Sequence, residues 1–194
     1  MKKLLLLLPA LCFALPGIAQ QVSLIPRVGL NLANTYPDSY ANMRPGINAG
    51  IGGEVRFSSL FALESGVYYS EQGNKKGNMK LKYDYLNVPV LAKFYLYKGF
   101  HLFAGPQWGI NLKAEVENAP MGGSFDPKEC YSGSLKSETY DFDFSLSMGA
   151  GYAFDCGLLV SANYNAGCTY IGRWRDSTAH NGVIQLNVGW LLKL

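Results

Sequence analysis

The sequence has few charged residues and few of the side chains that catalysis and metal binding use most. Only 16% of its 194 residues are charged, and it contains 2 histidines and 4 cysteines, without CxxC or HxxxH spacing. No pattern ties a nucleophile to either histidine, so we expect a non-enzymatic protein without metal or cofactor. The formal net charge of +3 is small, so we expect no nucleic-acid partner.

The chain also lacks long apolar runs, apart from one at its start. Residues 1–19 combine two lysines, an apolar run and small residues at Gly17 and Ala19, which is typical of a cleavable secretory signal. Two prolines interrupt the run, and it is shorter than the roughly 20 residues of a membrane-spanning helix. We therefore expect residues 1–19 to be removed and residues 20–194 to form one domain, with a net charge of about +1 after loss of the two lysines.

What the chain does contain is glycine, tyrosine and long alternating segments. It has 22 glycines and 13 tyrosines. In residues 159–171, apolar and polar side chains alternate almost without exception, as in a strand with one apolar and one polar face. Strands of soluble sandwiches are shorter, typically about five or six residues. The same pattern recurs in seven other segments, residues 22–32, 46–57, 61–70, 85–97, 100–116, 140–154 and 182–194.

The connections between these segments alternate between short and long. The short connections are expected to be tight turns, at residues 58–59, 98–99 and 155–157. Short periplasmic turns and long outer loops are typical of transmembrane barrels. The longer polar connections are residues 33–45, 71–80, 116–139 and 172–181.

The polar faces decide between a soluble and a membrane barrel. A soluble eight-stranded barrel keeps apolar side chains inside, whereas here the charged and amide-bearing face would line the interior. Only helices and closed barrels satisfy their backbone groups in lipid. The sequence therefore predicts an all-β fold, an eight-stranded antiparallel up-and-down transmembrane barrel in the outer membrane of a Gram-negative bacterium, surrounded by outer-membrane lipid.

Charged residues on the polar faces predict a network inside the barrel. Three of them lie at similar distances from the inner ends of successive strands: Glu54, Glu64 and Lys93. Arg56 lies just below Glu54, and Arg27 is on the neighbouring first strand. These charges must pair, because burial of an unpaired ion costs several kcal/mol. We expect them to fill a lumen that eight strands leave only wide enough for side chains. The alternative is a path for protons or a narrow solute.

In the outer half of the barrel, the same reasoning predicts a second group of charges. Lys113 in residues 100–116 is expected to face inward and to approach Asp141 and Asp143 of the next segment. Together with the five residues of the inner half, these three complete the predicted lumen charge network.

The cysteines of the mature chain permit one disulfide. Cys156 lies in a periplasmic turn, roughly a membrane height from Cys168 on the same strand, so these two cannot bond. Cys130, in the longest outer loop, is the candidate partner of Cys168 in an oxidising environment. The alternative is that Cys168 is simply a small lipid-facing residue.

The two histidines leave one catalytic alternative. His101 lies near a periplasmic turn, and His180 lies in the last outer loop beside Asp176 and Ser177. A hydrolase at the barrel rim would need an aspartate and a histidine that face each other across the mouth, with a nucleophile nearby.

Several segments resemble the PorT-like family of small outer-membrane β-barrel proteins. They are "YLNVPVLAKFYL", "FAGPQWGINLKAE", "DFDFSLSMGAGY", and the early "VGLNLAN" followed by "LESGVYYSEQG". The similarity extends from about residue 23 to residue 194. It implies an eight-stranded outer-membrane barrel, often described as a porin. The family takes its name from a member involved in protein secretion, a role that belongs to one branch.

These observations favour a structural or surface-interaction protein with a lumen filled by side chains. The outer loops are the expected working surface for an extracellular ligand or protein, because loops on a rigid scaffold carry binding functions. We expect a monomer. The alternative is a narrow porin or transporter, or an accessory component of protein secretion.

Overall fold

The computed structural model describes residues 21–36, 42–120, 130–173 and 178–194. The signal peptide predicted for residues 1–19 lies outside these ranges. The described residues form an all-β structure with one short 3-10 helix, η2 (Lys136–Glu138). Within these residues, no helix has the length and apolar character needed to cross a membrane.

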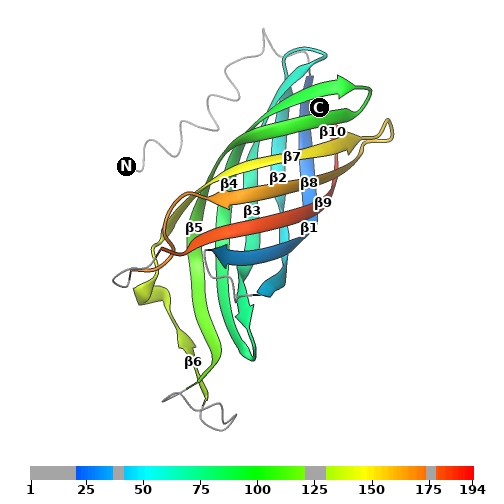
Figure 1. Ribbon diagram of the computed structural model, residues 1–194. Helices are drawn as coiled ribbons and strands as arrows, with labels where there is room; N and C mark the ends of the chain where they lie inside the picture. Colours follow the sequence, from blue (N-terminus) through cyan, green and yellow to red (C-terminus); the bar gives the residue numbers. More distant parts are fainter. Residues whose placement is uncertain (1–20, 37–41, 121–129, 174–177) are drawn as a thin grey trace.

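Eight long antiparallel strands form a closed barrel (Figure 1). Each pairs with its neighbour in chain order, and β9 pairs back with β1, with Val28 opposite Val188. The predicted fold is therefore confirmed. The eight strands are β1 (Gln21–Tyr36), β2 (Asn42–Arg56), β3 (Phe61–Lys76), β4 (Met79–Tyr97), β5 (Phe100–Pro120), β7 (Phe142–Ala153), β8 (Leu158–Gly167) and β9 (His180–Trp190).

Alternation along the strands separates the two faces of the barrel wall. Large apolar side chains such as Leu30, Met148 and Leu186 lie exposed on the outer surface, as expected for contact with lipid. Amides and charged side chains point inward and are buried. The interior is not uniformly polar, however, because several apolar side chains are also buried, among them those of Ile25, Leu91, Phe103 and Leu159.

The short turns lie together at the end of the barrel that contains the C-terminus (Figure 1). Residues 58–60, 98–99 and 155–156 form these turns. Gly157 follows the last of them with a φ of 95°, a conformation that glycine adopts without steric cost. Next to it, β10 (Leu192–Lys193) continues β9 and pairs with β1.

At the opposite end, β3, β4 and β5 extend beyond the rest of the barrel (Figure 1). The segment 71–80, predicted as a loop, continues the β3–β4 ladder as far as the pair Lys76 and Met79. In the predicted loop 116–139, β5 continues to Pro120, and β6 (Cys130–Ser134) pairs with it. These loop predictions were wrong in part, because polar side chains do not prevent a strand from continuing in water. We call β6 and the parts of β3, β4 and β5 beyond the rim the outer extension.

Candidate functional site

The inner half of the lumen contains an ion-pair cluster, which we call the ionic seal. Lys93 Nζ lies 2.5 Å from Glu54 Oε2 and 2.9 Å from Glu64 Oε2. Arg27 Nη2 lies 2.6 Å from Glu64 Oε1, and Arg56 Nη2 lies 3.6 Å from Glu54 Oε1. The structure thus brings together the five inner residues of the predicted network.

Strand register explains why this cluster forms. Glu54 on β2 lies directly opposite Glu64 on β3, a position in which two carboxylates repel each other. Ala62 pairs with Lys93, so β4 presents the lysine ammonium beside both carboxylates. Three neighbouring strands therefore each supply one charge to the same depth of the lumen. The lysine removes a repulsion that the β2–β3 ladder would otherwise contain.

Two tyrosines, which the sequence analysis did not single out for this site, complete the ionic seal. The Tyr95 hydroxyl donates to Glu54 at 2.9 Å, and the Arg56 guanidinium stacks 3.7 Å from the centre of the Tyr95 ring. Tyr68 donates to Glu64 at 3.4 Å, and its ring lies 5.2 Å from the Arg27 guanidinium. Tyr95 lies two positions after Lys93, so the period-2 pattern puts both on the same face, but that pattern alone gives no reason to assign Tyr95 to a carboxylate.

The ionic seal is tightly packed. Between it and the apolar side chains of Leu91, Phe103 and Leu159, the space open to the centre of a water molecule is ≈ 0 Å³. His101 is buried at the same end, where its Nδ1 donates to the Gly99 carbonyl oxygen at 3.0 Å and its ring packs on Tyr95. His101 therefore serves packing in this half of the barrel.

Above the ionic seal, amide side chains link the strands across the lumen. Asn31 Nδ2 donates to Ser70 Oγ at 2.9 Å, and Asn31 Oδ1 accepts from Asn48 at 2.7 Å and from Gln185 at 2.8 Å. Asn163 continues this network, donating to Gln185 Oε1 at 3.0 Å. A network of this size rigidifies an interior when its members are satisfied. Alternation in the sequence puts polar side chains on one face of each strand, but it does not show that these residues form one connected group.

A third layer covers the outer mouth of the barrel. Ile171, in the connection after β8, packs with the buried side chains of Tyr83, Tyr85 and Ala114. Leu81, Leu135 and Ala179 surround this cluster. Below it, Asp143 accepts from Thr169 at 2.6 Å and from Asn181 at 3.4 Å, and Asn181 also reaches the Tyr85 hydroxyl.

The second part of the predicted charge network is wrong for Lys113 and Asp141, and only its third residue, Asp143, is buried inside the barrel. Lys113 has a side chain that is 55% exposed, and it pairs with Glu115 at 2.9 Å instead of Asp141 or Asp143. The cause is a register shift, because Asp84 pairs with Lys113 while Tyr85 pairs with Asn111. Because this β-bulge at Leu112 adds one residue to β5, side chains after it that would have pointed inward point outward, and the reverse.

Asp141 and Asp143 lie on different sides of the barrel wall. Asp143 is buried, with 7% of its surface exposed, and is held by hydroxyl and amide groups. Asp141 lies outside the lumen, 2.6 Å from Lys136 Nζ and 3.5 Å from Arg173 Nη2. The sequence predicted both aspartates inward because they follow the same alternation, but β7 begins only at Phe142.

The Asp141 pair predicts a measurable pH response. The hydrogen bond from Lys136 lowers the pKa of Asp141 below its usual value. A lowered pKa means that the pair stabilises the outer loops above the normal aspartate range and loses this effect as pH falls through the folded-state value. Replacing Lys136 by methionine should raise the Asp141 pKa towards normal, as followed by a carboxyl-carbon NMR titration.

The matched control for that titration is Lys82→Met, which removes a cation that instead pairs with Glu117. This substitution removes no contact of Asp141, so the midpoint of the Asp141 titration should not change. Equal Asp141 midpoints in the wild type and the Lys136→Met variant would contradict the assignment.

The predicted disulfide is not formed. Cys168 is a free, exposed thiol next to Phe144, which pairs with Trp108 of β5. Cys130 instead pairs with Pro120, twelve positions further along β5, which corresponds to roughly 40 Å of strand. The unexpected length of β5 therefore carries Cys130 away from Cys168. Cys156 is exposed in its turn.

His180 lies at the mouth, between two tyrosine rings. Its ring centre is 5.5 Å from that of Tyr36 and 4.8 Å from that of Tyr170. The rim-hydrolase alternative also involved Asp176 and Ser177, which lie outside the described residues. Within the part of the chain that the structure describes, no group of three or more His, Cys, Asp or Glu residues is placed to hold a metal ion.

Comparison with known proteins agrees with this architecture. The family model of the outer membrane protein beta-barrel domain matches residues 18–171, well over half of the chain. The chain belongs to this family. Its place is accordingly the outer membrane, where the apolar belt of the barrel contacts lipid. No curated protein matches the chain in a sequence search.

Solved structures of small outer-membrane proteins share the fold. Ail, the attachment invasion locus protein of Yersinia pestis, has a TM-score of 0.52 and 14% identity, over 89% of this chain and 98% of Ail. Neisserial surface protein A has a TM-score of 0.51 and 17% identity, over 90% of this chain and 97% of that protein. Ail has also been solved with the heparin analogue sucrose octasulfate, with a TM-score of 0.51 and 12% identity, over 89% of this chain and 99% of Ail. At these identities the similarity concerns the fold.

Proposed function

We propose that this protein is a non-enzymatic outer-membrane barrel with a closed lumen, and that it acts through its outer extension. The observation that carries the proposal is the ionic seal. Lys93, Glu54 and Glu64 are paired across the lumen, and a dry apolar layer lies against them. A diffusion path would have to break a buried ion pair, and breaking one by loss of a partner typically costs about 3–5 kcal/mol.

The working surface in this proposal is the outer extension. Its outward face carries both signs of charge, with Lys82 paired to Glu117 and Lys113 paired to Glu115. Rigid sheet that projects from a membrane presents such groups at a fixed distance from the lipid. An extracellular ligand or protein is the proposed partner class, and the Ail complex with a heparin analogue is in keeping with this class for the fold.

Further features of the proposal rest on sequence. Residues 1–19 act as a secretory signal that is removed, and the barrel works as a monomer. Within its family, membership of the PorT-like group is part of the proposal, and the order of the segments quoted above supports it. A role as a narrow transporter or as an accessory component of secretion remains the competing proposal, since charged lumen residues also occur in ion paths.

Planar-bilayer conductance separates the two proposals. The refolded chain from residue 20 to residue 194 should show no discrete openings, because the ionic seal leaves no continuous water path. The positive control replaces all five charged residues of the ionic seal by serine, so that no charge is left in the lumen without its partner: Arg27, Glu54, Arg56, Glu64 and Lys93. That variant should conduct. Solute-sensitive openings in the wild type would contradict the closed lumen and favour the transporter.

A further inference from the structure

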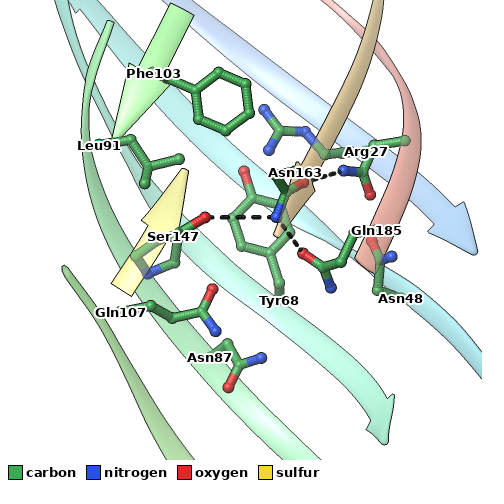
Figure 2. Close-up of a pocket in the computed structure, with 12 residues that line it drawn as sticks. Arg27, Asn48, Tyr68, Asn87, Leu91, Phe103, Gln107, Ser147, Asn163 and Gln185 are labelled. Atoms are coloured by element: carbon green, nitrogen blue, oxygen red, sulfur yellow. Dashed lines mark hydrogen bonds between the residues drawn. The ribbon is translucent and has the colours of Figure 1, made fainter. Parts of the chain in front are cut away.

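A small cavity lies just above the ionic seal, in the middle of the lumen (Figure 2). The space open to the centres of water molecules is ≈ 20 Å³. One water molecule needs about 10–15 Å³ on this measure, so the cavity is large enough for about one. In Figure 2 the Tyr68 ring occupies the centre of the view, with Arg27 and Phe103 on one side and Asn87 and Gln107 on the other.

Two polar atoms of residues that line this cavity lack a hydrogen-bond partner among the residues that the structure describes. One is a donor, Arg27 Nε, and the other is an acceptor, Asn187 Oδ1. Both side chains are deeply buried, with 10% of the Arg27 side chain and 5% of Asn187 exposed. A buried polar atom left unsatisfied costs about 1–3 kcal/mol, and native proteins rarely leave one without a water or an ion.

Existing contacts fix the orientation of both groups. Asn187 Nδ2 donates to Asn163 Oδ1 at 2.9 Å, so an amide rotated by 180° would bring two oxygens together. The Arg27 guanidinium is held by Glu64 at Nη2, next to Nε. The unsatisfied donor and acceptor are therefore properties of this packing.

Strand register brings the two groups close together. Arg27 on β1 pairs with Gly189 on β9, and Asn187 pairs with Gly29, so Arg27 and Asn187 are diagonal neighbours on the same face. A Cβ at Gly29 would overlap with Asn187 Oδ1, which shows that the amide oxygen lies over this glycine, two positions from Arg27. The lack of a side chain at Gly29 leaves room for that oxygen.

We propose that this cavity is a binding site for one ordered water molecule that accepts from Arg27 Nε and donates to Asn187 Oδ1. The two groups require a ligand that is both acceptor and donor. A halide or another small anion would accept from Arg27 but would be repelled by the amide oxygen, and a cation would be repelled by the guanidinium. Water satisfies both, and a single ordered water typically makes two to four such bonds.

This site goes beyond the closed-lumen proposal and does not depend on it. The water would give Arg27 Nε a partner next to the bond from Nη2 to Glu64, so that both the water and Glu64 orient the guanidinium. The lumen would then be hydrated directly above the ionic seal and dry beside it, where Leu91, Phe103 and Leu159 pack.

The test is a water-to-protein NOE experiment on the refolded protein in detergent, read at the Arg27 Nε–H signal. We expect an NOE to a long-lived water in the wild type and its loss in Asn187→Leu, which removes the acceptor and fills the cavity. Asn165→Leu is the matched control, because Asn165 is equally buried but does not line the cavity. The control should retain the NOE.

Two results would overturn the site. One is the absence of a water NOE at Arg27 Nε–H in the wild type, and the other is an unchanged NOE in a folded Asn187→Leu variant. Should that variant fail to fold, wild-type crystals soaked in sodium bromide give an independent answer. An anomalous bromide peak beside Arg27 would show an anion site, whereas a water peak without bromide signal would support the proposal. The conductance of the wild type decides the closed lumen separately.

Discussion

Replacing Lys93 by methionine is expected to lower the free energy of unfolding by about 3–5 kcal/mol. The substitution leaves Glu54 and Glu64 opposite each other in the β2–β3 ladder, both nearly inaccessible to solvent. Arg27 still reaches Glu64, but Glu54 retains only the more distant Arg56 and the Tyr95 hydroxyl. The cost comes from uncompensated carboxylate charge, since methionine fills a similar volume.

Urea unfolding of the barrel in lipid vesicles, followed by tryptophan fluorescence, measures this loss. Lys82→Met is the matched control, because Lys82 makes an ion pair with Glu117 that is about one-third exposed. Exposed pairs contribute about 0–1 kcal/mol. Adding Glu54→Gln to Lys93→Met should recover part of the stability. If the Lys93 and Lys82 variants unfolded at the same urea concentration, the ionic seal would not stabilise the barrel.

The second large effect is expected for Tyr68→Ala, at about 3–5 kcal/mol, as for other buried aromatic truncations. The Tyr68 ring lies over glycines of both β2 and β3. A Cβ at Gly50 would lie 2.6 Å from Tyr68 Cδ1, and one at Gly66 would lie 2.9 Å from Tyr68 Cε2. The ring also lines the central cavity and faces Arg27 (Figure 2). Its removal would leave a hole over three bare positions of the wall, since Gly52 also lies beneath the ring.

The same urea experiment tests this prediction, with two controls. Tyr97→Ala removes a tyrosine that is 69% exposed at the periplasmic end, and its effect should stay near ±0.5 kcal/mol. Tyr68→Phe keeps the ring and loses only the 3.4 Å contact with Glu64, so it should resemble the wild type more than Tyr68→Ala does. Equal stabilities for Tyr68→Ala and Tyr97→Ala would show that the ring does not pack the lumen.

Much of the barrel could be predicted from the sequence because the information is local. The side-chain period of a strand is two, so a segment with one apolar face shows it in its own letters. The structure exposes Leu30, Met148 and Leu186, which lie on the apolar faces of the alternating segments 22–32, 140–154 and 182–194. The depth of Glu54, Glu64 and Lys93 could be counted from the short turns, because short turns fix the register of the strands that they join.

The remaining features depend on contacts between residues distant in the chain. A single β-bulge at Leu112 turned Lys113 to the outside, and the local alternation contains no sign of it. Polar composition predicted loops where β3, β4 and β5 continue, and that extra length separates Cys130 from Cys168. Ile171 closes the outer mouth only because the connection after β8 reaches Tyr83 and Tyr85 on β4.

The sequence by itself therefore determined the class of fold, the facing of most strand residues and the composition of the ionic seal. Only the tertiary structure decided the partners within it, the tyrosines that complete it, the amide network and the cavity beside Arg27 and Asn187. The physical reason is the range of the interactions. The direction in which a strand residue points follows from its neighbours in the chain and from one buried or lipid-facing surface. A contact inside the lumen depends instead on the register of all eight strands together. A shift of one residue in any strand replaces the side chain that points inward.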